Sequence, residues 1–82
     1  MINVQVNYSG KVQEYAGEEA SILRLPDGAD VALFFRELTS QKPNIKDISK
    51  FLFVSVNGSM APRNRVLQDG DEIHLFFRMG GG

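Results

Sequence analysis

The residues of this chain that could take part in chemistry gather at its C-terminal end, where Gly80, Gly81 and Gly82 occupy the last positions. Because glycine has no side chain, such a tail can enter a channel that excludes larger residues. Fully extended, the five residues from Arg78 onward span about 16–18 Å. A terminal carboxylate is an anion and a poor electrophile at neutral pH, so it reacts only after activation, for example as an acyl-adenylate on another protein. Taken alone, the glycines favour an inert terminus, which is the common case.

The other candidates for catalysis or metal binding lack partners in the sequence. His74 is the single histidine, and no serine, aspartate or second histidine is spaced to form a proton relay with it. Asp69, Asp71 and Glu72 lack the ligand spacing of a calcium loop and fit a turn. The chain contains no cysteine, which excludes a disulfide, a thiolate zinc site and a cysteine nucleophile. We therefore expect no metal and no bound cofactor.

Apolar side chains on a strand face that no helix covers indicate a docking surface. Strand alternation turns Phe76 and His74 away from Leu75, and it turns Phe53 away from its two neighbours in the chain. Met60 follows a predicted turn, and methionine adapts to varied partners. Since exposed apolar patches mark interaction sites, we expect Phe53, Met60 and Phe76 to contact a partner. Scattered apolar residues of no function are the alternative.

Alternation of apolar and polar residues predicts strands with one buried face. These strands cover residues 2–8, 21–25, 52–56 and 72–77, with a brief return over 59–61 after the hairpin signal Asn57-Gly58. In the second strand we expect Ile22 to point inward, with Leu23 or Leu25 beside it. Residues 12–16 fit either an irregular loop or one helical turn.

An amphipathic helix is predicted between the second and third strands. Asp30 stands where an N-cap is needed, and Pro43 stops the helix. The apolar stripe, at spacing i, i+3, i+4, i+7, consists of Val31, Phe34, Phe35 and Leu38. The loop over residues 62–68 is expected to be anchored by Val66 and Leu67.

Length and charge limit the classes of protein that fit. With 82 residues there is room for one domain. We expect it over residues 1–77, followed by a flexible Gly-Gly tail over residues 78–82. The net charge of −1 leaves no basic excess for nucleic acid or an anionic membrane. Without a membrane-length apolar run or a signal-peptide pattern, we expect a cytoplasmic protein.

The order strand, strand, helix, strand, short strand, strand favours an α+β fold of the β-grasp (ubiquitin-like) type. We expect a mixed sheet of about four to five strands with one main helix packed on one face. The opposite face is then free for solvent or for a partner.

Several segments together resemble the ubiquitin-like sulfur carriers, a family that includes the small subunit of molybdopterin synthase and the thiamine-pathway carrier. The segments are residues 56–58 and 66–73, Phe76, the terminal Gly81-Gly82, and residues 8–17 and 26–31. The last two resemble the molybdopterin branch, whereas residues 60–63 are similar to the thiamine carrier. The resemblance covers nearly the whole chain.

The resemblance implies a mechanism for the tail. An adenylating enzyme similar to ubiquitin-activating enzymes would use ATP to join AMP to the carboxylate of Gly82, next to Gly81. Sulfur would then replace an oxygen, and the resulting thiocarboxylate would donate sulfur in molybdopterin (molybdenum or tungsten cofactor) biosynthesis. The chain would have no catalytic activity alone and would insert its tail into the molybdopterin synthase large subunit or an equivalent acceptor. The residues expected to contact partners are Phe53, Met60, His74, Phe76, Arg78, Met79 and Gly80.

Three other functions remain open at this point. The chain could serve the thiamine pathway or another sulfur-transfer pathway. It could be a ubiquitin-like modifier, which passes the same acyl group to lysines of target proteins. It could also be a β-grasp binding module whose tail is inert.

Overall fold

The computed structural model describes residues 1–78, in which a five-stranded sheet carries helices on one face. The strands are β1 (Ile2–Tyr8), β2 (Ala20–Leu25), β3 (Leu52–Val56), β4 (Ser59–Met60) and β5 (Glu72–Phe77). The helical segments are α1 (Val12–Ala16), α2 (Val31–Gln41), α3 (Pro43–Ile48) and the 3-10 turn η1 (Ser49–Phe51). Met79, Gly80, Gly81 and Gly82, all predicted to belong to the tail, lie outside the described residues.

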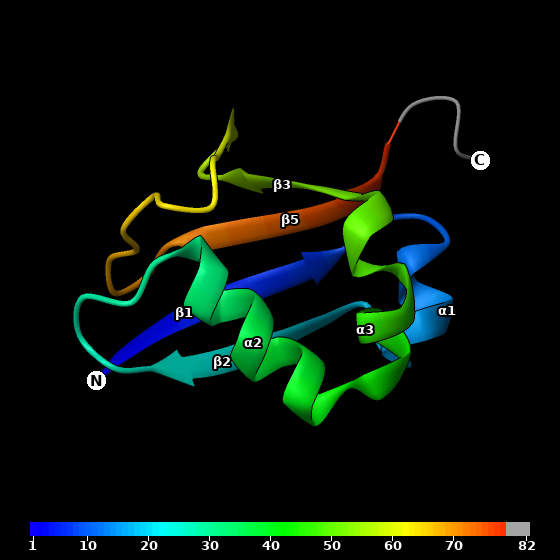
Figure 1. Cartoon of the computed structure of the whole chain (residues 1–82), viewed down its shortest axis with the longest axis horizontal. Helices are drawn as coiled ribbons and strands as arrows, with labels where there is room; N and C mark the ends of the chain where they lie inside the picture. Colours follow the sequence, from blue (N-terminus) through cyan, green and yellow to red (C-terminus); the bar gives the residue numbers. More distant parts are fainter. Residues whose placement is uncertain (79–82) are drawn as a thin grey trace.

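β1 and β5 form the centre of the sheet, whose strand order is β2-β1-β5-β3-β4 (Figure 1). β1 runs antiparallel to β2, with Val4 opposite Leu23, and parallel to β5, with Val6 opposite Ile73. β3 pairs antiparallel with both β5 and β4. This mixed sheet confirms the predicted α+β β-grasp architecture. Because β5 has a neighbour on each side, the sheet holds the strand that leads into the tail.

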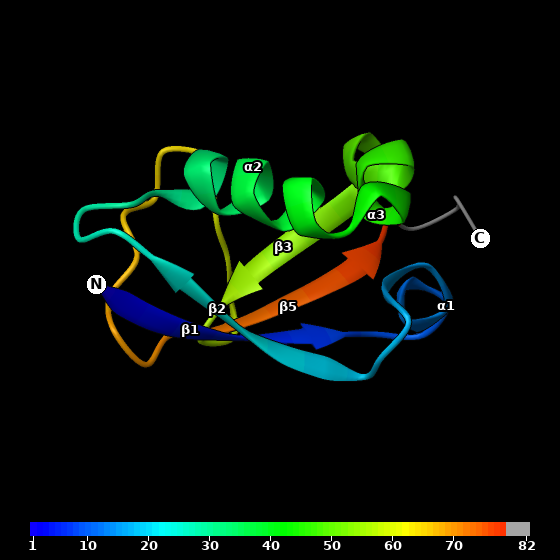
Figure 2. The same cartoon turned by 90° about the horizontal axis from the view of Figure 1, so that it is seen from below.

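α2 and α3 lie on one face of the sheet and leave the opposite face uncovered (Figure 2). The buried residues of α2 are the predicted stripe, Val31, Phe34, Phe35 and Leu38. α2 ends at Gln41, and Pro43 is the first residue of α3, a position where its missing N–H costs nothing. Within residues 1–78, no helix is long and apolar enough to cross a membrane.

The first turn of α2 finds acceptors for its backbone N–H groups inside the domain. The N–H of Val31 donates to the carbonyl of Arg65 at 3.0 Å, and the N–H of Ala32 donates to the carbonyl of Arg63 at 2.9 Å. The N–H of Leu33 donates to the carboxylate of Asp30 at 2.9 Å, which confirms the predicted N-cap. These contacts leave no free donor in this turn for a bound phosphate.

Asp30→Ala is expected to lower the free energy of unfolding by about 1 kcal/mol, because the N–H of Leu33 loses its acceptor. Urea denaturation followed by circular dichroism measures this as a lower midpoint at unchanged slope. Asp30→Asn is the control, since an amide oxygen can accept the same hydrogen bond. An equal loss in both variants would contradict the capping role.

Two of the predicted inward-facing residues point outward instead. Ile22 is 72% exposed, because its register partner Gln5 places it on the face opposite Leu23 and Leu25, which are both buried. Val66 is also exposed, whereas Leu67 alone anchors the loop in the core. In each case the predicted direction of the side chain is wrong by one residue, since adjacent residues of an extended chain point in opposite directions.

Residues 12–16 form the short helix α1, one of the two alternatives left open by the sequence. Val12 and Ala16 are buried on its inner side. Gly17 ends the helix with a φ of 81°, and its N–H donates to the carbonyl of Gln13 at 2.8 Å. A positive φ is easily adopted by glycine, so α1 stops there and the chain turns into β2.

The turn between β3 and β4 is the predicted Asn57-Gly58 hairpin. Both residues have positive φ, 52° and 88°, as a type I′ turn requires. The Asn57 side chain donates to the carboxylate of Asp71 at 2.8 Å and accepts from the N–H of Glu72 at 2.9 Å. These bonds tie the hairpin to the start of β5 and so fix Met60 on the edge strand β4, beside β3.

Candidate functional site

The uncovered face of the sheet carries an aromatic pair near the end of β5. Phe53 on β3 lies directly opposite Phe76 on β5. Their ring centroids are 6.0 Å apart with an interplanar angle of 66°, an edge-to-face arrangement. Both side chains are partly exposed. The pair therefore presents a preformed apolar surface close to the tail.

Strand pairing places Met60 and His74 on this same face. Met60 lies opposite Ser55, and Ser55 lies opposite His74. Directly opposed residues point to the same side of a sheet, and Ser55 shares its side with Phe53. The predicted placement of these residues on the helix-free face is thus confirmed, while their contact with a partner stays a prediction. We call Phe53, Met60 and Phe76 the docking face.

His74 is a surface residue of this face. Its Nε2 lies 3.9 Å from the Glu72 carboxylate, a longer distance than a hydrogen bond allows. In the part of the chain that the structure describes, no group of three or more His, Cys, Asp or Glu side chains could hold a metal ion.

The tail begins where three elements meet. Phe77 pairs with Leu52 at the end of β5, and the N–H of Arg78 donates to the carbonyl of Phe51 at 3.0 Å. The Arg78 guanidinium lies over the Phe53 ring, 5.4 Å from its centroid. Figure 1 shows this end of β5 beside α1 and the turn that follows α3. We call Phe77 and Arg78 the tail root.

Tyr15 also lies at the tail root, and sequence reasoning missed it. Its ring packs edge-to-face on Phe77, with centroids 6.1 Å apart and an interplanar angle of 70°. Phe51, which offers the carbonyl to Arg78, was missed as well. Both residues belong to short helical segments without a usable periodicity, so the available signal is their aromatic character alone.

α1 is fastened to the rest of the domain by Lys42, the residue between α2 and α3. The ammonium of Lys42 donates to the carbonyl of Ala16 at 2.9 Å and forms an ion pair with Glu18 at 2.6 Å. Nearby, the hydroxyl groups of Tyr8 and Ser21 share a hydrogen bond of 2.8 Å. Burial raises the pKa of the Tyr8 phenol, which therefore stays neutral. This polar cluster is structural, and it fixes the helix that carries Tyr15.

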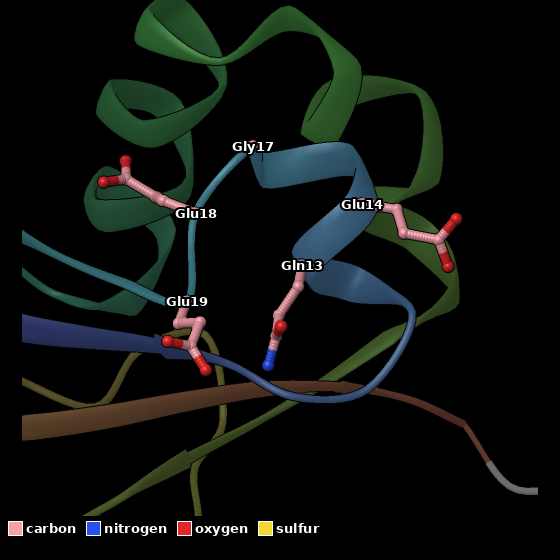
Figure 3. A pocket seen from close by; sticks show the side chains of 5 residues that line it. All are labelled: Gln13, Glu14, Gly17, Glu18 and Glu19. Atoms are coloured by element: carbon pink, nitrogen blue, oxygen red, sulfur yellow. The ribbon is translucent and has the colours of Figure 1, made fainter.

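A shallow hollow next to α1 is lined by Gln13, Glu14, Gly17, Glu18 and Glu19 (Figure 3). The three carboxylates point in different directions, and Glu14 points away from the hollow. Since Glu18 already pairs with Lys42, the hollow offers no convergent set of ligands. It lies on another part of the surface than the docking face.

The sequence of this chain matches a known family over most of its length. The model of the ThiS family matches residues 6–82. Among curated proteins, the molybdopterin synthase sulfur carrier subunit of Mycobacterium tuberculosis is 32% identical over 83 residues, which cover 100% of each chain.

Solved structures share the fold. The putative molybdopterin converting factor, subunit 1, from Pyrococcus furiosus has a TM-score of 0.88 at 24% identity, covering 96% of this chain and 100% of that one. The complex of subunits 1 and 2 of molybdopterin-converting factor from Helicobacter pylori contains a chain with a TM-score of 0.71 at 23% identity, covering 99% of this chain and 100% of that one. At these identities, the structures establish the common fold.

Proposed function

The chain belongs to the ThiS family, and from this membership we propose that it is a sulfur carrier of molybdopterin biosynthesis. The observation that carries the proposal is the full-length match, at 32% identity, to a molybdopterin synthase sulfur carrier subunit. The position of the tail root beside the docking face supports it, because a partner bound to Phe53 and Phe76 would also receive the tail.

The chemistry takes place at the carboxyl group of Gly82. One carboxylate oxygen attacks the α-phosphorus of ATP on an adenylating enzyme, and pyrophosphate leaves. A sulfur nucleophile at the oxidation level of hydrosulfide then attacks the acyl carbon, and AMP leaves. The product is a thiocarboxylate on Gly82, which carries sulfur without any cysteine in the chain. Gly81 leaves the approach to this carbon free of side chains.

The partners recognise the folded domain and receive its tail. The docking face is the proposed contact for both the adenylating enzyme and the acceptor, with His74 and Arg78 at its margin. Met79 and Gly80, which follow in the sequence, are proposed to contact these partners as well. The acceptor is a molybdopterin synthase large subunit or its equivalent. The Helicobacter pylori complex, which joins subunits 1 and 2 of molybdopterin-converting factor, supports an assembly of this kind. ATP is a substrate of the adenylating enzyme and is not bound by this chain. The chain alone has no catalytic activity.

Mass spectrometry tests the proposal directly. The purified chain is incubated with its cognate adenylating enzyme, ATP and a sulfide donor. We expect a mass increase that corresponds to the exchange of one oxygen for sulfur, located by fragmentation at Gly82. Omission of ATP is the control. Persistent absence of this species with all components present would refute the carrier function.

A second candidate is a protein modifier, which the terminal Gly81-Gly82 also fits. It uses the same adenylate but transfers the acyl group to a lysine amine. Gly-Gly remnants on lysines of other proteins, recovered after proteolysis, would favour it. Co-purification from the native source separates the sulfur pathways, since a pterin synthase subunit and a thiazole synthase are different partners.

A further inference from the structure

We propose that Tyr15 is a positioning residue for activation of the tail and that it acts by holding Phe77. The inference rests on the proposed function, because it concerns how the Gly82 carboxylate reaches the nucleotide of the adenylating enzyme. Tyr15 lies outside the docking face, on α1, and its ring meets the last residue of β5.

The helix that carries the Tyr15 ring is held in place on the domain. α1 is anchored by the buried side chains of Val12 and Ala16, and Lys42 holds the carbonyl of Ala16 at 2.9 Å. Tyr15 itself is 42% exposed, so filling the core does not account for an aromatic residue there. What an aromatic side chain at this position does is contact Phe77 edge-to-face, with the two ring centroids 6.1 Å apart.

The tail root is restrained from its other sides as well. The N–H of Arg78 donates to the carbonyl of Phe51 at 3.0 Å, and the Arg78 guanidinium lies 5.4 Å from the Phe53 ring centroid. Together with Tyr15, these contacts come from α1, η1 and β3. They set the direction in which the chain leaves the sheet.

The direction of the tail root determines how often the carboxylate reaches a fixed target. Four residues follow Arg78, and they span at most about 13–14 Å. When the tail lies extended in the channel of the enzyme, a change in direction at the tail root therefore shifts Gly82 by several ångströms, whereas reaction requires approach to about 3–3.5 Å. Loosening Phe77 is expected to slow the chemical step without weakening the docking face.

The experiment is carrier-dependent ATP–pyrophosphate exchange on the cognate adenylating enzyme, with the concentration of the full chain varied. For Tyr15→Ala we expect kcat to fall about tenfold, while KM for the carrier stays within about twofold. Tyr15→Phe is expected to restore kcat, because the ring and not the hydroxyl contacts Phe77. Hydrogen exchange of the Arg78 amide is expected to be faster in Tyr15→Ala than in the wild type.

Glu14→Ala is the matched control, since Glu14 is the exposed neighbour of Tyr15 on α1. We expect its kcat and KM to equal those of the wild type. A higher KM at unchanged kcat in Tyr15→Ala would make Tyr15 a direct docking contact and overturn the positioning role. Unchanged kinetics would overturn it too. If the wild-type chain itself supports no exchange, the proposed function fails, and not merely this inference.

Discussion

Removal of Gly81 and Gly82 is expected to lower thiocarboxylate formation more than about a hundredfold, although the shortened chain still ends in a glycine carboxylate. The reacting carboxylate is chemically the same on Gly80. A lower yield of thiocarboxylate would therefore mean that the carboxylate does not reach the ATP, and not that it is less reactive. The two residues contribute about 7 Å of extended chain. We expect the adenylating enzyme to hold ATP at a fixed depth, so a carboxylate that stops several ångströms short of the α-phosphorus would not attack it.

Mass spectrometry after incubation with the adenylating enzyme, ATP and a sulfide donor measures this loss. The control is competition, because the truncated chain keeps the docking face and is expected to inhibit activation of the full-length chain. A truncated chain that fails to compete would show instead that the last two residues carry the binding. If a thiocarboxylate formed on Gly80 of the truncated chain as fast as it forms on Gly82 of the full-length chain, the length of the tail would not limit the reaction and the prediction would be wrong.

The docking face could be predicted from local sequence because strand alternation assigns each side chain to a face. Leu75 and Val54 are buried, so Phe76 and Phe53 lie on the other side, and the structure confirms this. The same rule failed at Ile22, since Ile22 and Leu23 are adjacent and both apolar. Only the pairing with β1, which places Gln5 opposite Ile22, decides which of the two is buried.

The contacts that hold the tail root could not be predicted, because they join residues that are distant in the sequence. Tyr15 meets Phe77, and Lys42 holds the carbonyl of Ala16. Neither α1 nor η1 is long enough to show a helical period. α1 follows β1 in the chain, and the sheet order places β1 next to β5 although the two strands lie at opposite ends of the sequence. α1 therefore packs against the end of β5.

Phe76→Glu is expected to weaken binding of the chain to the adenylating enzyme by about 30-fold or more, as loss of a central interface residue does. Phe76 is the docking-face residue on β5, the strand that leads into the tail, and it packs on Phe53. A carboxylate at this position must be desolvated against an apolar partner surface. The dissociation constant is measured by isothermal titration calorimetry, and the expected sign in exchange kinetics is a higher KM at unchanged kcat, the reverse of Tyr15→Ala.

Ile22→Glu is the matched control for this prediction. It makes the same kind of change on the same face of the sheet, but on the edge strand β2, two strands from β5, and at a site that is 72% exposed. We expect its dissociation constant to stay near that of the wild type. Loss of the Phe53–Phe76 contact costs about 0.5–1.5 kcal/mol of stability, so thermal melting must show that Phe76→Glu remains folded at the assay temperature. Equal weakening in both variants would mean that the partner binds across the whole face and not at the end of β5.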